Sequence, residues 1–141
     1  MLIHVMRAWQ RSQESGVDDS GWLMALRDPV VAGALARIHA RPAETWTVGS
    51  LAAEVNVSRA TLARRFADLV GESPLAYLTR WRMDVAAQRL RDTDDSIGAV
   101  ADCVGYRSEY AFSRAFARHR GLAPGRYRRA ARQHRSSARA A

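Results

Sequence analysis

The second half of the chain carries the same residue pattern twice. Val48-Gly49-Ser50-Leu51-Ala52 aligns with Ile97-Gly98-Ala99-Val100-Ala101, at an offset of 49 (97 minus 48). The second copy then has one extra residue, so the offset becomes 50. The later matches are Ser58 with Ser108, Leu62 with Phe112, Arg64 with Arg114, Phe66 with Phe116, Gly71 with Gly121, Pro74 with Pro124 and Tyr77 with Tyr127. A solenoid needs at least three repeats, so the pattern predicts one duplicated unit.

Each copy has the pattern of a helix, a tight turn and a second helix. Apolar residues recur at helical spacing in the first helices; they are Val48, Leu51, Ala52 and Val55, and Ile97, Val100, Ala101 and Val104. Asn56-Val57 forms the first turn, and Gly105 can take a positive φ in the second. Ser58 and Ser108 suit the N-caps of the second helices. We therefore predict helix-turn-helix motifs over about 48–69 and 97–119.

Helical periodicity continues outside the copies, and no long alternating stretch suggests strands, so the predicted fold class is all-α. Ser73 and Pro74 suit the start of a long joining helix, Leu75 to Arg91, and Asp28-Pro29 suits the start of another, ending near His39. Residues 1–28 are predicted to be an N-terminal helical linker segment, with short helices at Leu2–Trp9 and Trp22–Leu26. Residues 132–141 are expected to form a disordered basic tail.

Positive charge is concentrated where the duplication lies. All 22 basic residues are arginine. Residues 1–46 hold five arginines and five acidic residues, whereas residues 47–141 hold 17 arginines and nine acidic residues and carry the whole net charge of +8. Such charge favours a polyanionic partner, because neutralising phosphates releases condensed counterions. The alternative is an arginine-rich coding bias with solvated helix faces.

The outward faces of the two second helices are candidate DNA-recognition surfaces, because a recognition helix enters the major groove. Their base-facing candidates are Arg59, Ala60, Ala63 and Arg64 in the first copy, and Glu109, Tyr110, Ser113 and Arg114 in the second. Arg64 and Arg114 suit guanine or a phosphate. The first face is lined by alanine and the second is polar, so we expect the second helix to carry more hydrogen-bonded discrimination.

Phosphate contacts are expected at the helix ends and next to the two Gly-x-x-Pro-x-x-Tyr segments. Free N–H groups at a helix N-terminus attract anions. The candidates are Ser58, Ser108, Arg80, Arg82, Arg126, Arg128 and Arg129. Tyr77 and Tyr127 are expected to be packing residues.

Other classes of function find little support in the sequence. The histidines His4, His39, His119 and His134 have no paired metal-ligand spacing, and no catalytic constellation appears, so we expect neither an enzyme nor a metal or cofactor. Cys103 is expected to pack in the core, and a single cysteine fits a reducing cytoplasm. No apolar run of 18 residues or secretory signal is present, so no membrane association is expected. A helical protein-interaction module and an RNA-binding module stay as alternatives.

Three groups of residues together resemble a known family. In the second copy they are Gly105-Tyr106-Arg107-Ser108, Phe112 to Phe116 and Gly121 to Arg128. In the first copy they are Leu51-Ala52, Val57-Ser58 and Leu62 to Phe66, and on the joining helix Tyr77 to Met83. Over about residues 29–131 the chain is similar to the DNA-binding domain of the AraC/XylS family of bacterial transcription regulators.

The resemblance implies two helix-turn-helix subdomains held by the joining helix. It implies recognition helices in successive major grooves of double-stranded DNA, roughly 34 Å apart, so that one chain reads an asymmetric site. It also makes transcriptional activation the expected role and RNA polymerase a candidate partner.

Residues 1–28 are similar to segments that follow a cupin-like effector domain in this family. Nothing precedes Met1, and 46 residues cannot build a jelly roll, so no effector pocket is expected. The chain is either a stand-alone short member or the C-terminal piece of a longer regulator. The apolar stripe Leu2, Val5, Met6 and Trp9 then folds back, forms a dimer or stays exposed.

Overall fold

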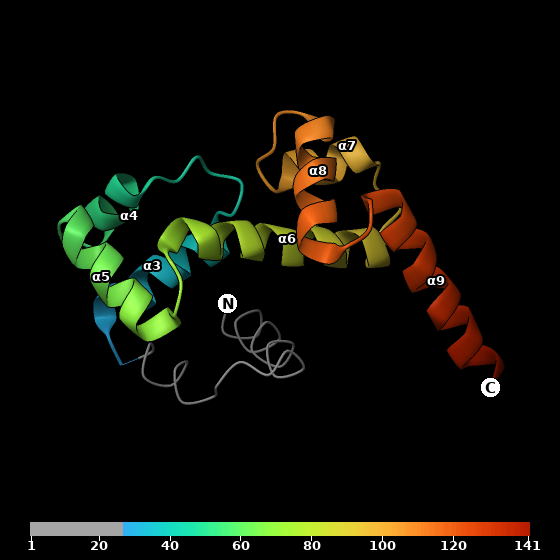
Figure 1. The fold of residues 1–141 in the computed structure, drawn as a ribbon, viewed down its shortest axis with the longest axis horizontal. Coiled ribbons are helices and arrows are strands. Elements are labelled where there is room, and N and C mark those ends of the chain that lie inside the picture. The colour runs from blue at the N-terminus through green and yellow to red at the C-terminus, as the bar shows by residue number, and fades with distance from the viewer. Residues whose placement is uncertain (1–26) are drawn as a thin grey trace. The chain divides into compact units, whose positions relative to one another are not determined.

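The computed structural model describes residues 27–141, and these residues form helices without any strand (Figure 1). This confirms the predicted all-α class. The helices are α3 (Pro29–Ala40), α4 (Val48–Glu54), α5 (Arg59–Val70), α6 (Pro74–Asp92), α7 (Ile97–Cys103), α8 (Glu109–Arg120) and α9 (Pro124–Ala140). The helices and apolar stripe expected within residues 1–26 lie outside the described residues.

The chain divides into two compact units, each with one helix-turn-helix motif. Of the described residues, 27–41 and 46–77 belong to the first unit, with α3, α4, α5 and the start of α6. Residues 42–45 and 78–141 belong to the second, with the rest of α6 and α7, α8 and α9. The chain therefore passes between the units at three peptide bonds, before residues 42, 46 and 78.

Polar side chains start the helices where the sequence predicts. Asp28 accepts hydrogen bonds from the amides of Val30 and Val31 at the start of α3. Ser58 accepts from the Thr61 amide at 3.2 Å, and Ser108 accepts from the Ala111 amide at 3.2 Å. These caps satisfy amides that have no partner inside the helix, which fixes where α5 and α8 begin.

The two turns differ as the alignment indicates. Asn56 has a φ of 58° in the first turn and Gly105 has a φ of 86° in the second. A methyl group added at Gly105 would lie 2.7 Å from the carbonyl oxygen of Ala43. Only glycine therefore fits the second turn without displacing residue 43, both because of its positive φ and because of this close approach.

Each motif is closed by the helix that follows it. Tyr77 of α6 packs edge-on against Phe66 of α5, with ring centres 5.8 Å apart, and Tyr127 of α9 packs in the same way against Phe116 of α8, at 5.2 Å. Phe66 and Phe116 are fully buried. The expectation that both tyrosines are packing residues is confirmed, and α9 is the structural counterpart of α6.

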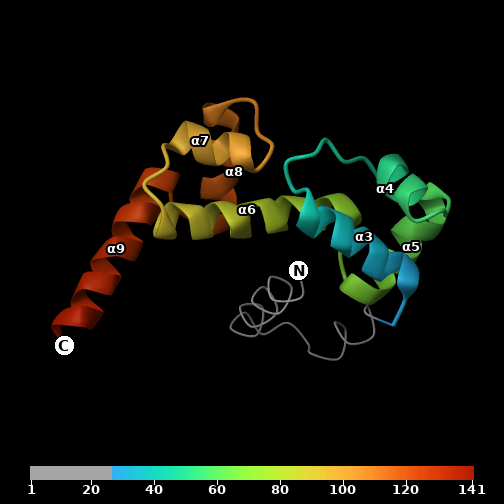
Figure 2. The ribbon, with the colours of Figure 1, turned by 180° about the vertical axis from the view of Figure 1, so that it is seen from behind.

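Helix α6 also contributes to the core of the second unit. Its residues Met83, Ala86, Ala87 and Leu90 form one buried cluster with α7 and α8. Figures 1 and 2 show α7 and α8 beside the part of α6 that follows residue 78. In the first unit, α3 is the helix that packs against the helix-turn-helix pair, since it contacts α4 and α5. It buries Val31, Ala34, Leu35 and Ile38.

Two predictions about the second unit were wrong. Helix α9 continues to Ala140, where a disordered tail is expected from residue 132. Arg132 pairs with Asp94, and Arg135 pairs with Asp92, so the basic extension is paired with acidic residues at the end of α6 and just after it. Cys103 is exposed rather than packed, because Val104 takes the buried position at the end of α7. No helix within residues 27–141 is long and apolar enough to cross a membrane.

The imidazole of His39 gives a prediction about acid stability. Its Nε2 is hydrogen-bonded to the Tyr77 hydroxyl, and burial lowers its pKa to about 4. The unfolded chain takes up this proton near pH 6.5 whereas the folded chain does not, so stability present above pH 6.5 is lost as the pH falls toward 4.

We expect His39 to reduce the free energy of unfolding by roughly 2 kcal/mol between pH 7 and pH 4.5. Urea unfolding of the native chain and of His39→Gln, which does not titrate, measures this contribution as the difference between their pH profiles. Equal slopes for the two proteins would contradict the role of His39.

Candidate nucleic-acid interface

Helix α5 presents a face of arginine and alanine outside the core of the first unit. Leu62 and Phe66 are fully buried, whereas Arg59, Ala60 and Arg64 are exposed. Ala63 is half-buried on the same side. Neither Arg59 nor Arg64 has a hydrogen bond or ion pair to another residue within 27–141. The helix therefore offers two unpaired guanidinium groups beside small methyl groups.

Helix α8 presents a more polar face. Tyr110 is 71% exposed, and the guanidinium carbon of Arg114 lies 5.7 Å from the centre of its ring. This cation–π contact limits the orientations of both side chains. Glu109 is exposed at the first position of the helix, and Ser113 is half-buried. A hydroxyl, a carboxylate and a guanidinium thus share a face that in α5 holds alanine and arginine.

Glycines in the preceding helices leave room for the first residue of each exposed face. A methyl group at Gly49 would lie 3.2 Å from Cδ of Arg59, and one at Gly98 would lie 3.3 Å from Oε2 of Glu109. The two contacts are equivalent in the repeat, but the residues have opposite charges. The N-terminal end of α5 is therefore positive where that of α8 is negative.

The hydroxyl groups of the two capping serines differ in whether they can still donate a hydrogen bond. The Ser58 hydroxyl donates to Oγ1 of Thr61 at 2.9 Å, so both its donor and its acceptor functions are used locally. Ser108 accepts from Ala111, and its hydroxyl proton has no acceptor among the described residues. Ser108 is thus the better donor to an incoming anion.

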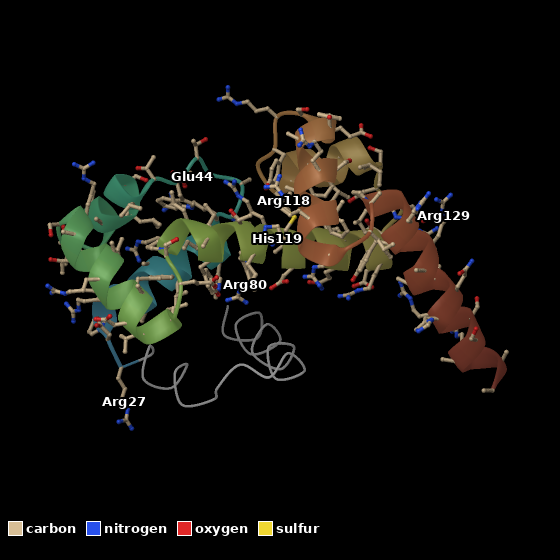
Figure 3. All side chains as sticks on the ribbon, viewed as in Figure 1. Arg27, Glu44, Arg80, Arg118, His119 and Arg129 are labelled. Carbon is tan, nitrogen blue, oxygen red and sulfur yellow. The ribbon has the colours of Figure 1, made fainter. Side chains whose placement is uncertain are left out.

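Two of the arginines predicted to contact phosphate are used inside the protein. Arg82 donates to the carbonyl oxygens of Pro42 and Glu44, at 2.7 and 2.9 Å, and burial lowers the pKa of its guanidinium. Arg128 donates to the carbonyl oxygens of Leu90 and Asp95. These contacts argue against the phosphate role predicted for Arg82 and Arg128, because their donors already satisfy backbone acceptors. Arg80 lies half-buried on α6 (Figure 3).

Four other arginines are better candidates for an anion contact, because their guanidinium groups are exposed and unused among the described residues. Arg107, Arg118, Arg126 and Arg129 are exposed and have no hydrogen bond or ion pair to another described residue. Arg126 and Arg129 were predicted, whereas Arg107 and Arg118 were not; Figure 3 labels Arg118 on α8 and Arg129 on α9. The residue pattern could not separate them from paired arginines, since the partners lie far away in sequence. Within residues 27–141 no cluster of His, Cys, Asp and Glu could hold a metal ion.

Comparison with known proteins decides the family. A family model described as a helix-turn-helix domain matches residues 51–130. A protein of Streptomyces antibioticus, described as an AraC-like transcription regulator, is 50% identical over 129 residues, which are 92% of this chain and 42% of that protein. The chain belongs to the AraC/XylS family. The Acinetobacter baylyi regulator AlkR is 45% identical over 111 residues, which are 79% of this chain and 36% of AlkR.

The AraC-type fold is also found among solved structures. The DNA-binding domain of AdpA, crystallised in complex with a target DNA, has a TM-score of 0.72 and 37% identity; the match covers 77% of this chain and 97% of that one. The chain spans about two fifths of the length of the curated relatives it matches. It therefore contains the DNA-binding domain of this family.

Two neighbouring arginines allow a test of the distinction between paired and unpaired arginines. We expect Arg128→Ala to lower the free energy of unfolding by about 1–2 kcal/mol, since two carbonyl groups lose their donor. The matched variant Arg129→Ala removes the same charge from an exposed position, so its change should stay within about 0.5 kcal/mol. Chemical denaturation of both variants measures the difference, and similar losses would show that the Arg128 contacts contribute nothing.

Proposed function

We propose that this chain binds double-stranded DNA sequence-specifically through the exposed faces of α5 and α8 and thereby regulates transcription. The observation that carries the proposal is that each helix-turn-helix unit buries one face of its second helix and leaves unpaired or ring-stacked arginine on the other. Membership of the AraC/XylS family supports it. So does the DNA complex of the related AdpA domain.

We assign the base contacts to the two exposed faces. In α5 they are Arg59, Ala60, Ala63 and Arg64, where alanine methyl groups suit thymine and Arg64 suits guanine. In α8 they are Glu109, Tyr110, Ser113 and Arg114. The carboxylate of Glu109 can accept from a cytosine amino group, and the stacked Arg114 can donate to guanine. The two helices would thus read different bases, which suits an asymmetric site in two successive major grooves.

The phosphate contacts are assigned to arginines that have no hydrogen bond or ion pair to another residue within 27–141. We assign them to Arg107, Arg118, Arg126 and Arg129, together with the amides at the starts of α5 and α8, where Ser58 and Ser108 cap. Such contacts position a protein on the duplex without reading its sequence.

Three further roles rest on the family resemblance and, for dimerisation, on the apolar stripe in the sequence of residues 2–9. Activation through RNA polymerase, action as the C-terminal part of a longer effector-responsive regulator, and dimerisation through the N-terminal segment are proposals that extend the DNA-binding role. Transcription in vitro from a promoter that holds the selected site, with and without the chain, decides the sign of regulation.

A salt titration tests the DNA-binding proposal. We expect log K for a duplex selected from random DNA to fall linearly with log salt, and specific DNA to outcompete random DNA. Arg129→Ala should reduce the salt slope by about 1 and weaken binding to all sequences alike. A shallow slope without preference for the selected duplex would favour the protein-interaction alternative.

The two recognition faces are compared by alanine substitution. We expect Tyr110→Ala/Arg114→Ala to flatten base preference in its half-site, because α8 carries more hydrogen-bonding groups. The discrimination should fall by about 1–3 kcal/mol for each base that α8 no longer reads. Arg64→Ala should weaken binding with a smaller change in preference. Binding to a panel of permuted sites measures both, and an equal loss of preference would contradict the greater role of α8.

A further inference from the structure

The turn of the second helix-turn-helix motif, residues 104–107, packs against a segment that precedes both motifs in the chain. This segment is residues 42–44, and it belongs to the same compact unit as the turn, α7 and α8. A methyl group placed on Gly105 would lie 2.7 Å from the carbonyl oxygen of Ala43 and 3.0 Å from its Cα. The backbone of residue 43 therefore lies directly on the turn, at a distance that excludes a side chain at position 105.

Arg82 of α6 holds the backbone of residues 42–44. Its guanidinium donates to the carbonyl oxygen of Pro42 at 2.7 Å and to that of Glu44 at 2.9 Å. These acceptors stand on either side of Ala43, the residue that touches the turn. A planar guanidinium donates to two acceptors in a fixed fork, whereas a lysine ammonium is a single point charge. The contact therefore depends on arginine at position 82 and on the path of the backbone that it binds.

The same guanidinium contacts the turn and, through it, α8. The guanidinium carbon of Arg82 lies 5.9 Å from the centre of the Tyr106 ring, within the range of a cation–π contact. The Tyr106 ring packs edge-on against that of Phe112 at 5.7 Å, and Phe112 is fully buried on the inner face of α8. Residues 42–44, Arg82, the turn and the inner face of α8 thus form one continuous set of contacts within the second unit.

The turn of the first motif is covered at the corresponding place by a helix. Val55 follows α4 as Val104 follows α7, and the two valines are equivalent in the repeat. A methyl group placed on Gly33 of α3 would lie 2.9 Å from Cγ1 of Val55. Close packing against the turn is therefore found in both motifs: the first receives it from α3, and the second receives it from residues 42–44.

We propose that residues 42–44, held by Arg82, brace the turn of the second motif and thereby set the orientation in which α8 presents its outer face to DNA. The inference rests on the proposed DNA-binding function and deepens it, because it gives residues outside both motifs a part in base discrimination. Binding groups must be held within about 0.5 Å of their productive positions, and this requires neighbours that lock the element carrying them. Arg82 is then a positioning residue, which touches neither base nor phosphate.

Binding of the full chain to two duplexes tests the brace. The first is the duplex selected by the native chain, and in the second the base pairs whose preference Arg114→Ala loses are changed. Arg82→Met keeps the aliphatic stem and removes the donors. We expect it to weaken binding at least about fivefold on the first duplex and less than about twofold on the second, because a misplaced α8 loses base contacts. Its salt slope should stay native, because no phosphate contact is removed.

Two further arginine variants separate positioning from phosphate contact and from a loss of charge. Arg107 is exposed in the same turn and has no hydrogen bond or ion pair within residues 27–141. Arg107→Met should weaken binding to both duplexes alike and lower the salt slope by about 1. Arg89→Met removes a charge from an exposed position of α6, where Arg89 pairs with Asp95, and should bind both duplexes as the native chain does. If Arg82→Met behaves like Arg107→Met, Arg82 contacts phosphate and the brace is overturned.

Two glycine variants test the contact from the side of the turn. Gly105→Ala places a methyl group against residue 43 and should reproduce the binding profile of Arg82→Met. Gly121→Ala carries a similar backbone strain, since φ is 77° at Gly121 and 86° at Gly105, but no atom lies within 4 Å of its added methyl group. It should keep the native discrimination between the two duplexes. The glycine variants decide alone if Arg82→Met fails to fold, and native discrimination in folded Gly105→Ala or Arg82→Met overturns the brace.

Hydrogen exchange without DNA distinguishes failure of the brace from failure of the proposed function. The Tyr106 amide donates to the carbonyl oxygen of Ala101 at 2.9 Å, so its exchange reports opening of the turn. We expect this amide to exchange at least about tenfold faster in Arg82→Met and Gly105→Ala than in the native chain, because the turn opens more often without its support.

A second amide of the same unit shows whether the effect is local. The Gly121 amide donates to the carbonyl oxygen of Ala117 at 2.8 Å, and in Arg82→Met it should exchange at the native rate. Equal acceleration of the Gly121 and Tyr106 amides, or no acceleration of either, overturns the brace whether or not the chain binds DNA. Acceleration confined to the Tyr106 amide, in a chain whose native form does not discriminate between the two duplexes, overturns only the proposed function.

Discussion

The packing of a tyrosine against the buried phenylalanine of the second helix of each helix-turn-helix motif is the contact on which both units depend. Tyr77 packs edge-on against Phe66 of α5, and Tyr127 packs in the same way against Phe116 of α8. With this contact in place, the inner face of each of these helices lies against the core and the opposite face is exposed. Because α6 supplies Tyr77 at its start and the Met83–Leu90 face further along, one helix completes the first motif and supports the second.

Arginine has two separate roles in this molecule. Some arginines bind groups inside the protein. Arg82 and Arg128 donate to carbonyl groups of loops and helix ends, and Arg132 and Arg135 of α9 pair with Asp94 and Asp92 at the end of α6 and just after it. Others, such as Arg64 and Arg129, stay exposed without a partner in the described part of the chain. The net charge of +8 therefore counts arginines of two kinds: those whose donors are used inside the protein and those without a partner among residues 27–141.

Much of the fold could be predicted because its causes are local. Ser58 and Ser108 cap helices through their own neighbours, Asn56 and Gly105 take the positive φ of a turn, and Pro74 and Pro124 start helices. The same local logic failed for residues 132–141, since their helix is held by Asp92 and Asp94, about 40 positions earlier. It also failed for Cys103. This residue is the last of the seven-residue helix α7 and is exposed, whereas the next residue, Val104, is buried.

The sequence by itself determined the duplicated motif, the helix starts and the contrast between the alanine-lined outer face of α5 and the polar outer face of α8, because each depends on residue types at fixed short spacings. Only the tertiary structure decided which arginines of residues 27–141 donate to the backbone and which have no partner among the described residues. It also decided that residues 42–45 leave one unit for the other. The physical reason is that a guanidinium group donates to whatever acceptor the fold brings near, and carbonyl groups 38 and 40 positions away leave no trace in the residue pattern.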